Sequence, residues 1–211
     1  MARKRVAVLI SGRGSNMLAL IEAAKDAGYP AEIVLVVSNE PAAVGLKRAV
    51  AASIQTAVVD HRPFGKDREA FERALQRELA AHGIEIVCLA GFMRLLTPWF
   101  VRQWEGRLLN IHPALLPAFK GLDTHARALA AGVKEHGATV HFVVPEMDSG
   151  PVIAQGAAPV RAGDSAATLA ARVLEIEHRL YPRALRLVAE GRVRIVDGRC
   201  LIDGRPAVTN S

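Results

Sequence analysis

The 211-residue sequence has few cysteines, few aromatic residues and no long apolar run. Its two cysteines, Cys88 and Cys200, are too few for a disulfide framework, and no Cys-x-x-Cys pair suggests a zinc site. Aromatic residues make up 5% of the chain, so a stacking platform for nucleic acid is not expected. No apolar segment approaches the roughly 20 residues of a membrane-spanning helix. We therefore expect a cytoplasmic protein that uses no metal, nucleic acid or membrane.

The N-terminus superficially resembles a secretion signal, because Arg3, Lys4 and Arg5 precede an apolar run. That run, residues 6–10, is too short for a signal peptide and no small-residue cleavage site follows it, so it predicts a buried strand. The formal net charge of +6 is otherwise dispersed among acidic residues, which suits small anionic ligands. The length fits a single domain.

Apolar strands alternate with helical patterns through the first ninety residues. Phe71, Leu75 and Leu79 recur at helical spacing after Asp67, a candidate N-cap, and before Gly83. Helices are also expected from Met17 to near Gly28 and over 42–52, and strands over 5–10, 33–37, 56–59 and 84–89. This alternation predicts an α/β fold with a Rossmann-like, doubly wound parallel sheet.

The second half of the chain breaks this alternation. Strands are expected over 108–111, 139–144 and 152–157, and the loop between the last two is too short for a helical crossover. That pair should be antiparallel, so the sheet becomes mixed in this half. Ser165 is expected to cap a long helix that Pro182 bends or restarts, and the tail after Gly191 to form short edge strands.

Two polar residues close the strand expected at 108–111. In an extended segment, Asn110 and His112 share one face while Leu109 and Ile111 point to the other. Pro113 cannot continue the ladder. A carboxamide beside an imidazole can stabilise an oxyanion and carry a proton, as acyl transfer requires. The alternative is a strand end whose polar residues only satisfy backbone groups.

A glycine-rich turn, residues 11–16, follows the first strand and opens a helix. Its backbone N–H groups can face an anion at the positive helix end. Gly12 and Gly14 fit a dinucleotide fingerprint, but Met17 occupies the third glycine position. A phosphate monoester is the better match, and a tight turn that merely needs glycine is the alternative.

Two further loops carry candidate ligand contacts. Asp148 lies in a turn between two apolar strands, where an aspartate often caps only its own loop. The segment 91–96 follows the fourth strand directly, where it either lines a ligand crevice or joins the core. His125 and His141 are close enough in sequence to support the site. The remaining histidines are expected in loops or on helix surfaces; they are His61, His82, His136 and His178.

These segments together resemble the glycinamide ribonucleotide transformylases, a family of folate-dependent formyltransferases also called phosphoribosylglycinamide formyltransferases. The resemblance runs through nearly the whole chain. Its motifs are Ser11-Gly-x-Gly-Ser-Asn16, Ala90-Gly-Phe-Met-Arg94, Asn110-Ile-His-Pro113, Asp148-Ser-Gly150 and Glu177-His178. The sequence departs from the family pattern at Ala114, Asp123 and Leu174. It leaves the roles of Asp123, His125 and His141 unassigned.

The resemblance implies transfer of the formyl group of 10-formyltetrahydrofolate, a co-substrate, to the amine of 5′-phosphoribosylglycinamide in purine biosynthesis. The amine would attack directly, through a tetrahedral intermediate. Asn110, His112 and Asp148 would be catalytic. Substrate contacts would come from Gly14, Ser15, Asn16 and Glu177, and folate contacts from Arg68, Met93, Arg94, Leu95, Leu96, Asn110 and Val143.

The chain would then be one formyltransferase domain, with a phosphate-binding half at 1–106 and a catalytic and folate-binding half at 107–211. A monomer and a homodimer are both compatible with the sequence. A formyltetrahydrofolate hydrolase, or another folate formyl-transfer enzyme, is the nearest alternative. A nucleotide-binding regulatory module without catalysis is a more distant one.

Overall fold

The computed structural model describes residues 2–207, which fold as two compact units. Unit 1 extends to Asn110, and unit 2 begins at Ile111. No helix within the described part of the chain is long and apolar enough to cross a bilayer.

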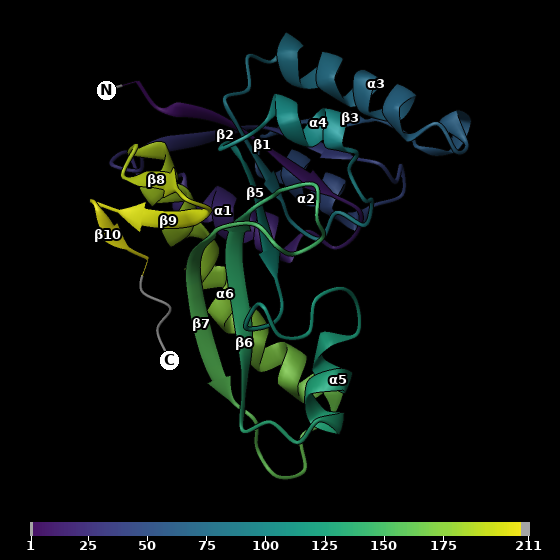
Figure 1. Cartoon of the computed structure of the whole chain (residues 1–211). Helices are drawn as coiled ribbons and strands as arrows, with labels where there is room; N and C mark the ends of the chain where they lie inside the picture. The colour runs from purple at the N-terminus through teal and green to yellow at the C-terminus, as the bar shows by residue number, and fades with distance from the viewer. Residues whose placement is uncertain (1, 208–211) are drawn as a thin grey trace. The chain divides into compact units, whose positions relative to one another are not determined.

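Unit 1 is built on parallel strands in the order β3-β2-β1-β4-β5 (Figure 1). The strands are β1 (Lys4–Ile10), β2 (Ala31–Ser38), β3 (Gln55–Val58), β4 (Ile86–Leu89) and β5 (Leu108–His112). The helices are α1 (Ser15–Ala23), α2 (Val44–Ala51), α3 (Arg68–Ala81) and α4 (Pro98–Gln103), with a 3₁₀ turn η1 (Arg62–Phe64). This confirms the parallel α/β pattern expected for the N-terminal half.

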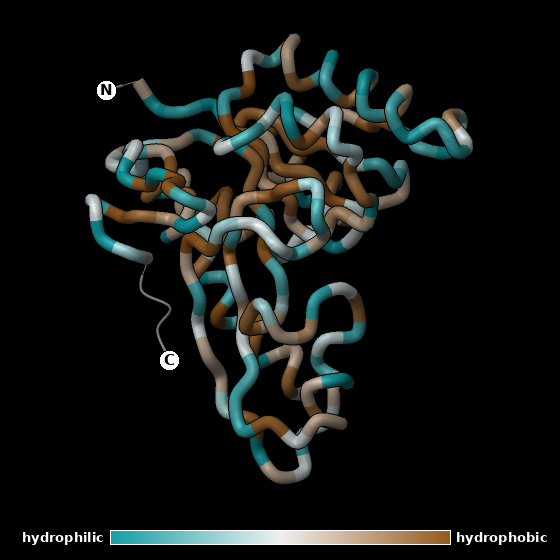
Figure 2. The backbone as a smooth tube through the Cα atoms, in the orientation of Figure 1, coloured by the Kyte–Doolittle hydropathy of each residue, from teal (hydrophilic) through white to brown (hydrophobic). Residues whose placement is uncertain are grey.

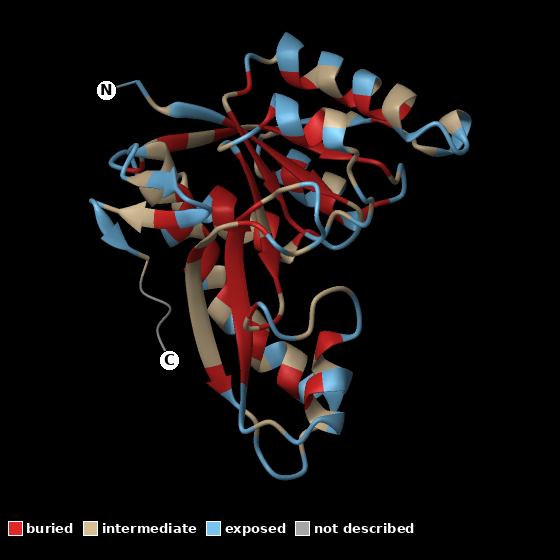
Figure 3. Cartoon of the chain, in the orientation of Figure 1, coloured by how far each residue is buried: buried red, intermediate tan, exposed pale blue. Residues whose placement is uncertain are grey.

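The core of unit 1 follows the hydropathy of its strands. Residues Val6–Ile10 of β1 are fully buried, and the brown stretches of Figure 2 coincide there with the red stretches of Figure 3. On α3 the stripe of Phe71, Leu75 and Leu79 is buried, as its spacing predicts. The Asp67 carboxylate caps this helix by accepting a hydrogen bond from the Ala70 N–H at 2.9 Å.

Unit 2 contains an antiparallel pair and a long helix. The pair is β6 (Glu135–Phe142) with β7 (Val152–Pro159), and α6 (Ala166–Ala189) packs against both strands. A short helix, α5 (Thr124–Ala130), precedes them. The antiparallel pairing is confirmed, but β6 begins four residues earlier than expected and ends at Phe142. Its register begins with Glu135 opposite Pro159.

Two details of unit 2 correct the sequence-based expectations. Ser165 does cap α6, in a reciprocal capping box with Thr168, but the helix continues through Pro182 without restarting. The tail strands form a separate antiparallel sheet in the order β10-β9-β8. Their bounds are β8 (Val193–Val196), β9 (Arg199–Ile202) and β10 (Arg205–Pro206).

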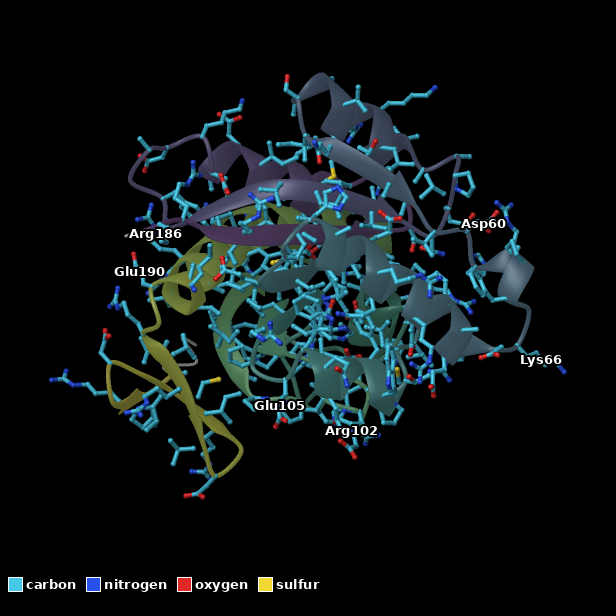
Figure 4. The ribbon with its side chains drawn as sticks, turned by 90° about the horizontal axis from the view of Figure 1, so that it is seen from above. Asp60, Lys66, Arg102, Glu105, Arg186 and Glu190 are labelled. Atoms are coloured by element: carbon cyan, nitrogen blue, oxygen red, sulfur yellow. The ribbon has the colours of Figure 1, made fainter. Side chains whose placement is uncertain are left out.

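Among the described Asp, Glu, Lys and Arg residues, all except Glu72 and Glu177 lie outside the buried core. Figure 4 shows Lys66 and Arg102 projecting away from the ribbon. Arg186 in the last turn of α6 and Glu190 at its C-cap are labelled in the same view, with 3.8 Å between Nη1 and Oε1. An exposed pair of this kind contributes at most a few tenths of a kcal/mol, so burial of the apolar strands provides most of the stability.

Candidate active site

His112, the last residue of β5, is buried and is flanked by two acceptors. Its Nε2 lies 3.0 Å from the Phe119 carbonyl oxygen, and its Nδ1 lies 3.4 Å from Oδ2 of Asp148. Because a carbonyl only accepts, Nε2 must carry the hydrogen in this contact. Nδ1 is then attracted to the carboxylate only when it also carries a hydrogen. Both ring nitrogens of His112 therefore face acceptor oxygens.

Asp148 faces a second imidazole, that of His141, at 3.8 Å between Oδ1 and Nε2. Burial lowers the pKa of His141, which favours its neutral form. His141 Nδ1 lies 2.8 Å from the Phe142 carbonyl, so in the neutral ring the hydrogen resides on Nδ1. Asp148 thus lies between two imidazoles, and its shorter contact is the one to His112.

The Asp148 turn depends on the geometry of its backbone. Asp148 has a positive φ of 49°, and its Oδ2 accepts a hydrogen bond from the Gly121 N–H at 2.9 Å. Two residues later, a Cβ on Gly150 would lie 1.8 Å from the Phe142 carbonyl oxygen. Only glycine permits this approach. The glycine of the Asp-Ser-Gly motif is therefore needed for steric reasons, separately from any role of the Asp148 carboxylate.

The loop that follows His112 is fixed by the buried hydroxyl of Thr139 on β6. This hydroxyl donates to the Ala114 carbonyl at 2.7 Å and accepts from the Leu116 N–H at 3.0 Å. It also accepts from Nε2 of Gln155 at 2.9 Å. The Thr124 hydroxyl donates to the Pro113 carbonyl at 2.7 Å. These bonds hold the chain directly after His112 in one conformation.

A buried histidine lies beside this loop: His136 is on a strand, contrary to the expectation that it would lie in a loop or on a helix surface. His136 is 1% exposed on β6, edge-on to His125 at 5.2 Å and to Phe119 at 5.7 Å between ring centroids. Neither ring nitrogen makes a hydrogen bond of ordinary geometry within the described residues, and a weaker contact with the Pro113 backbone favours the charged ring. Burial and the neighbouring His125 lower the pKa of His136 to about 4, so the ring is neutral near pH 7.

The glycine-rich turn of unit 1 has the geometry expected of an anion loop. Gly14 is the N-cap of α1, with a left-handed φ of 71° that suits glycine. Ser15 and Asn16 form the first turn of α1, where backbone N–H groups point out of the helix end. Asn16 is buried and Ser15 half-buried.

A second loop of unit 1, residues 91–96, is joined to the glycine-rich turn through Ser11. The Met93 N–H donates to the Ser11 hydroxyl at 2.7 Å, and this hydroxyl donates to Oδ1 of buried Asn39 at 2.5 Å. The Ser11 N–H donates to the Gly91 carbonyl at 3.1 Å. The two loops are thus fixed to each other at their first residues.

The same loop exposes apolar side chains, which agrees with a ligand-lining segment and not with core. Met93 is 68% and Leu95 64% exposed. The Arg68 guanidinium donates to the Leu95 carbonyl through Nε at 3.2 Å and Nη2 at 2.8 Å. Arg94 and Leu96 are half-buried. A flat, partly apolar ligand fits this combination of exposed aliphatic groups and fixed backbone.

The other expected site residues fall in three places. Asn110 is half-buried on β5, between Leu109 and Ile111, on the same side of the strand as His112. Glu177 is buried on α6, and Val143 directly follows β6. No group of three or more His, Cys, Asp and Glu among the described residues could hold a metal ion.

The structure brings together His112 and Asp148, which the sequence separates by a helix and a strand. It adds Phe119, whose backbone carbonyl binds His112, and Thr139, which fixes the following loop. Sequence reasoning missed both. A backbone acceptor carries no residue-type signal, and a threonine in a strand is ordinarily interpreted as a β-former.

Comparisons with known proteins agree with this fold and these motifs. The profile of the Formyl transferase family matches residues 4–185. Phosphoribosylglycinamide formyltransferase from Escherichia coli K12 is 46% identical over 200 residues, which cover 95% of this chain and 94% of that protein. The trifunctional purine biosynthetic protein adenosine-3 from Gallus gallus is 52% identical over 191 residues, covering 90% of this chain. The chain spans 19% of the length of that protein.

A solved structure extends the likeness to three dimensions. Glycinamide ribonucleotide transformylase 1 from Symbiobacterium toebii superposes with a TM-score of 0.92 at 44% identity, covering 95% of this chain and 94% of that one. The mixed α/β fold expected from the sequence is thereby confirmed.

The connection between the two loops of unit 1 can be tested by hydrogen exchange. Replacing Ser11 with Ala removes the acceptor of the Met93 N–H, so this amide should exchange about tenfold faster. Ser11→Thr retains a hydroxyl and should keep most of the protection. Residue-resolved exchange by NMR measures both. An unchanged Met93 rate in Ser11→Ala would show that the hydroxyl does not hold the loop.

Burial of His136 predicts a specific dependence of stability on pH. Its pKa is lowered from 6.5 to about 4, so between these values the unfolded chain binds a proton that the folded protein does not. The free energy of unfolding should therefore fall as the pH drops from about 6.5 toward about 4. In His136→Phe, urea unfolding at about pH 7 and about pH 5 should show a smaller loss, by on the order of 1 kcal/mol. Equal losses in both proteins would contradict the assignment.

Proposed function

Because the chain belongs to the formyl transferase family, we infer that it transfers a formyl group to the amine of 5′-phosphoribosylglycinamide, a step of de novo purine biosynthesis. The observation that carries this inference is the end-to-end match to the Escherichia coli enzyme of that name. The match covers almost the full length of both sequences, so the activity in the relative's name belongs to the part that this chain resembles. We propose 10-formyltetrahydrofolate as the formyl donor, a co-substrate.

We propose His112 as the proton-carrying group of the reaction. The contact with Asp148 at 3.4 Å supports this, because a carboxylate at that position can balance the charge of a ring that carries the transferred proton. In the free protein, Nε2–H donates to the Phe119 carbonyl. A substrate oxygen that develops negative charge would be the stronger acceptor and would replace that carbonyl. The cation then both stabilises the oxyanion and holds the proton that the leaving nitrogen requires.

Asn110 is the proposed second donor to the oxyanion. It lies two residues before His112 on one strand, so both side chains project from the same side of β5. The carboxamide N–H and the imidazolium N–H would flank the formyl carbon, which the substrate amine attacks directly. A strand end positions such donors more rigidly than a loop does. No covalent enzyme intermediate is required.

The remaining roles are assigned to the loops of each unit. Gly14, Ser15 and Asn16 are proposed to bind the substrate phosphate, which the helix N-terminus and the left-handed Gly14 support. Glu177 would contact the ribose. Exposed Met93 and Leu95 support a folate-binding role for their loop. The other proposed folate contacts are Arg68, Arg94, Leu96, Asn110 and Val143.

The acceptor specificity of the reaction tests the proposed function. Purified protein with 10-formyltetrahydrofolate should transfer the formyl group to glycinamide ribonucleotide and release little formate when that acceptor is omitted. The two products are separated by chromatography of the labelled formyl group. Formate release that does not depend on the acceptor would indicate a formyltetrahydrofolate hydrolase. No turnover under either condition would indicate a binding module.

Replacing Asn110 tests the proposed oxyanion donor. In Asn110→Ala the turnover number should fall about 100- to 1000-fold, because an oxyanion donor acts mainly in the transition state. Binding of glycinamide ribonucleotide, measured by calorimetry, should change by less than about threefold. Turnover within about threefold of the parent at saturating substrates would rule out this role.

A further inference from the structure

Helix α2 contacts the glycine-rich turn at two successive peptide groups. The Gly45 N–H, in the first turn of α2, donates to the Gly12 carbonyl at 2.9 Å. One turn later, Nη1 of Arg48 donates to the Arg13 carbonyl at 3.2 Å. Both bonds come from one helix and both are made to carbonyl oxygens of the turn.

These two bonds determine where the N–H groups of the turn point. In a planar trans peptide, the carbonyl of one residue and the N–H of the next point in opposite directions. With the carbonyls of Gly12 and Arg13 directed toward α2, the N–H groups of Arg13 and Gly14 are directed away from it. Neither of these N–H groups has a hydrogen-bond acceptor among residues 2–207. Successive amides of this kind form an anion-binding concavity.

Glycine at position 45 allows α2 to approach the turn this closely. A Cβ on Gly45 would lie 2.5 Å from Cδ1 of Ile10 and 3.0 Å from the Gly12 carbonyl oxygen. A Cβ on Gly14 would lie 3.2 Å from the Gly45 Cα. The two glycines therefore pack backbone to backbone. A larger residue at position 45 would push α2 away and lengthen both bonds to the turn.

We propose that Gly45 and Arg48 are positioning residues for the phosphate-binding turn: by holding the carbonyls of Gly12 and Arg13 against α2, they aim consecutive amides at the phosphate monoester of the substrate. This inference rests on the proposed function, which assigns the phosphate to that turn. It extends the substrate machinery to a helix that supplies no proposed ligand contact of its own. Arg48 acts through Arg13 and not by touching the phosphate.

Arg48 has an ordinary structural explanation that the experiment must separate from this role. It lies in the last turn of α2, where a cation stabilises the helix end by a few tenths of a kcal/mol. Lys47, its exposed neighbour on the same helix, carries the same charge and has no hydrogen bond to the turn within the described chain. Lys47→Ala is therefore the matched control for loss of charge.

The test measures binding of ribose 5-phosphate, a probe that contains the phosphate and lacks the reacting amine. Calorimetry should show about tenfold weaker binding for Arg48→Ala than for the parent, the loss expected when one charged hydrogen bond no longer fixes the turn. Arg48→Lys retains a donor and should recover part of the affinity. Lys47→Ala should bind within about twofold of the parent. In steady state, Arg48→Ala should raise KM for glycinamide ribonucleotide and leave kcat and KM for the folate unchanged.

Each outcome decides one of the two claims. Parent-like binding by Arg48→Ala, or an equal loss in Lys47→Ala, would overturn the positioning role and leave the proposed function intact. A parent protein that does not bind ribose 5-phosphate would instead overturn the phosphate assignment of the turn. Because Arg48 is exposed, the Ala variant should fold, and thermal unfolding confirms this. Gly45→Ala, which acts through sterics, should produce the same selective loss of ribose 5-phosphate binding.

Discussion

The contact between His112 and Asp148 is the interaction on which the rest of the proposed chemistry depends. A buried imidazolium is costly unless a charge faces it, and the Asp148 carboxylate, 3.4 Å away, is that charge. The left-handed backbone at Asp148 and the close approach of Gly150 to β6 hold the carboxylate in position. His141, whose pKa is lowered by burial, lies on the other side of the carboxylate at 3.8 Å. Much of unit 2 near the site can be understood as support for this pair.

Unit 1 supports ligand loops in a different way, by hydrogen bonds made to the backbone groups of those loops. Ser11 joins the glycine-rich turn to the loop that carries Met93, and α2 fixes two carbonyls of the same turn. None of these contacts involves a side chain that is proposed to touch a ligand. The proposed phosphate and folate loops are therefore held in place by neighbouring residues. These neighbours are serine, glycine and arginine, and their residue types alone do not indicate such a role.

Much of the fold was predictable because the spacing of apolar residues along the chain indicates which side chains are buried. The strands of unit 1 and the stripe of α3 followed directly from their apolar spacing. The sequence did not reveal α4 or α5, which are too short for a clear period. It placed His136 in a loop or on a helix surface, because one histidine in a polar stretch does not indicate a buried strand. It suggested the partnership of His112 and Asp148 only through a family resemblance, and it could not suggest the Phe119 carbonyl.

A double-mutant cycle on the rate of formyl transfer tests the His112–Asp148 partnership most directly. Single-turnover rates would be measured for the parent, His112→Asn, Asp148→Asn and the double variant, with binding of both substrates confirmed for each. If Asp148 acts through His112, its replacement should slow the parent strongly and slow His112→Asn by less than about twofold. If instead the two losses multiply, the residues act independently and the pair is not the centre of the chemistry.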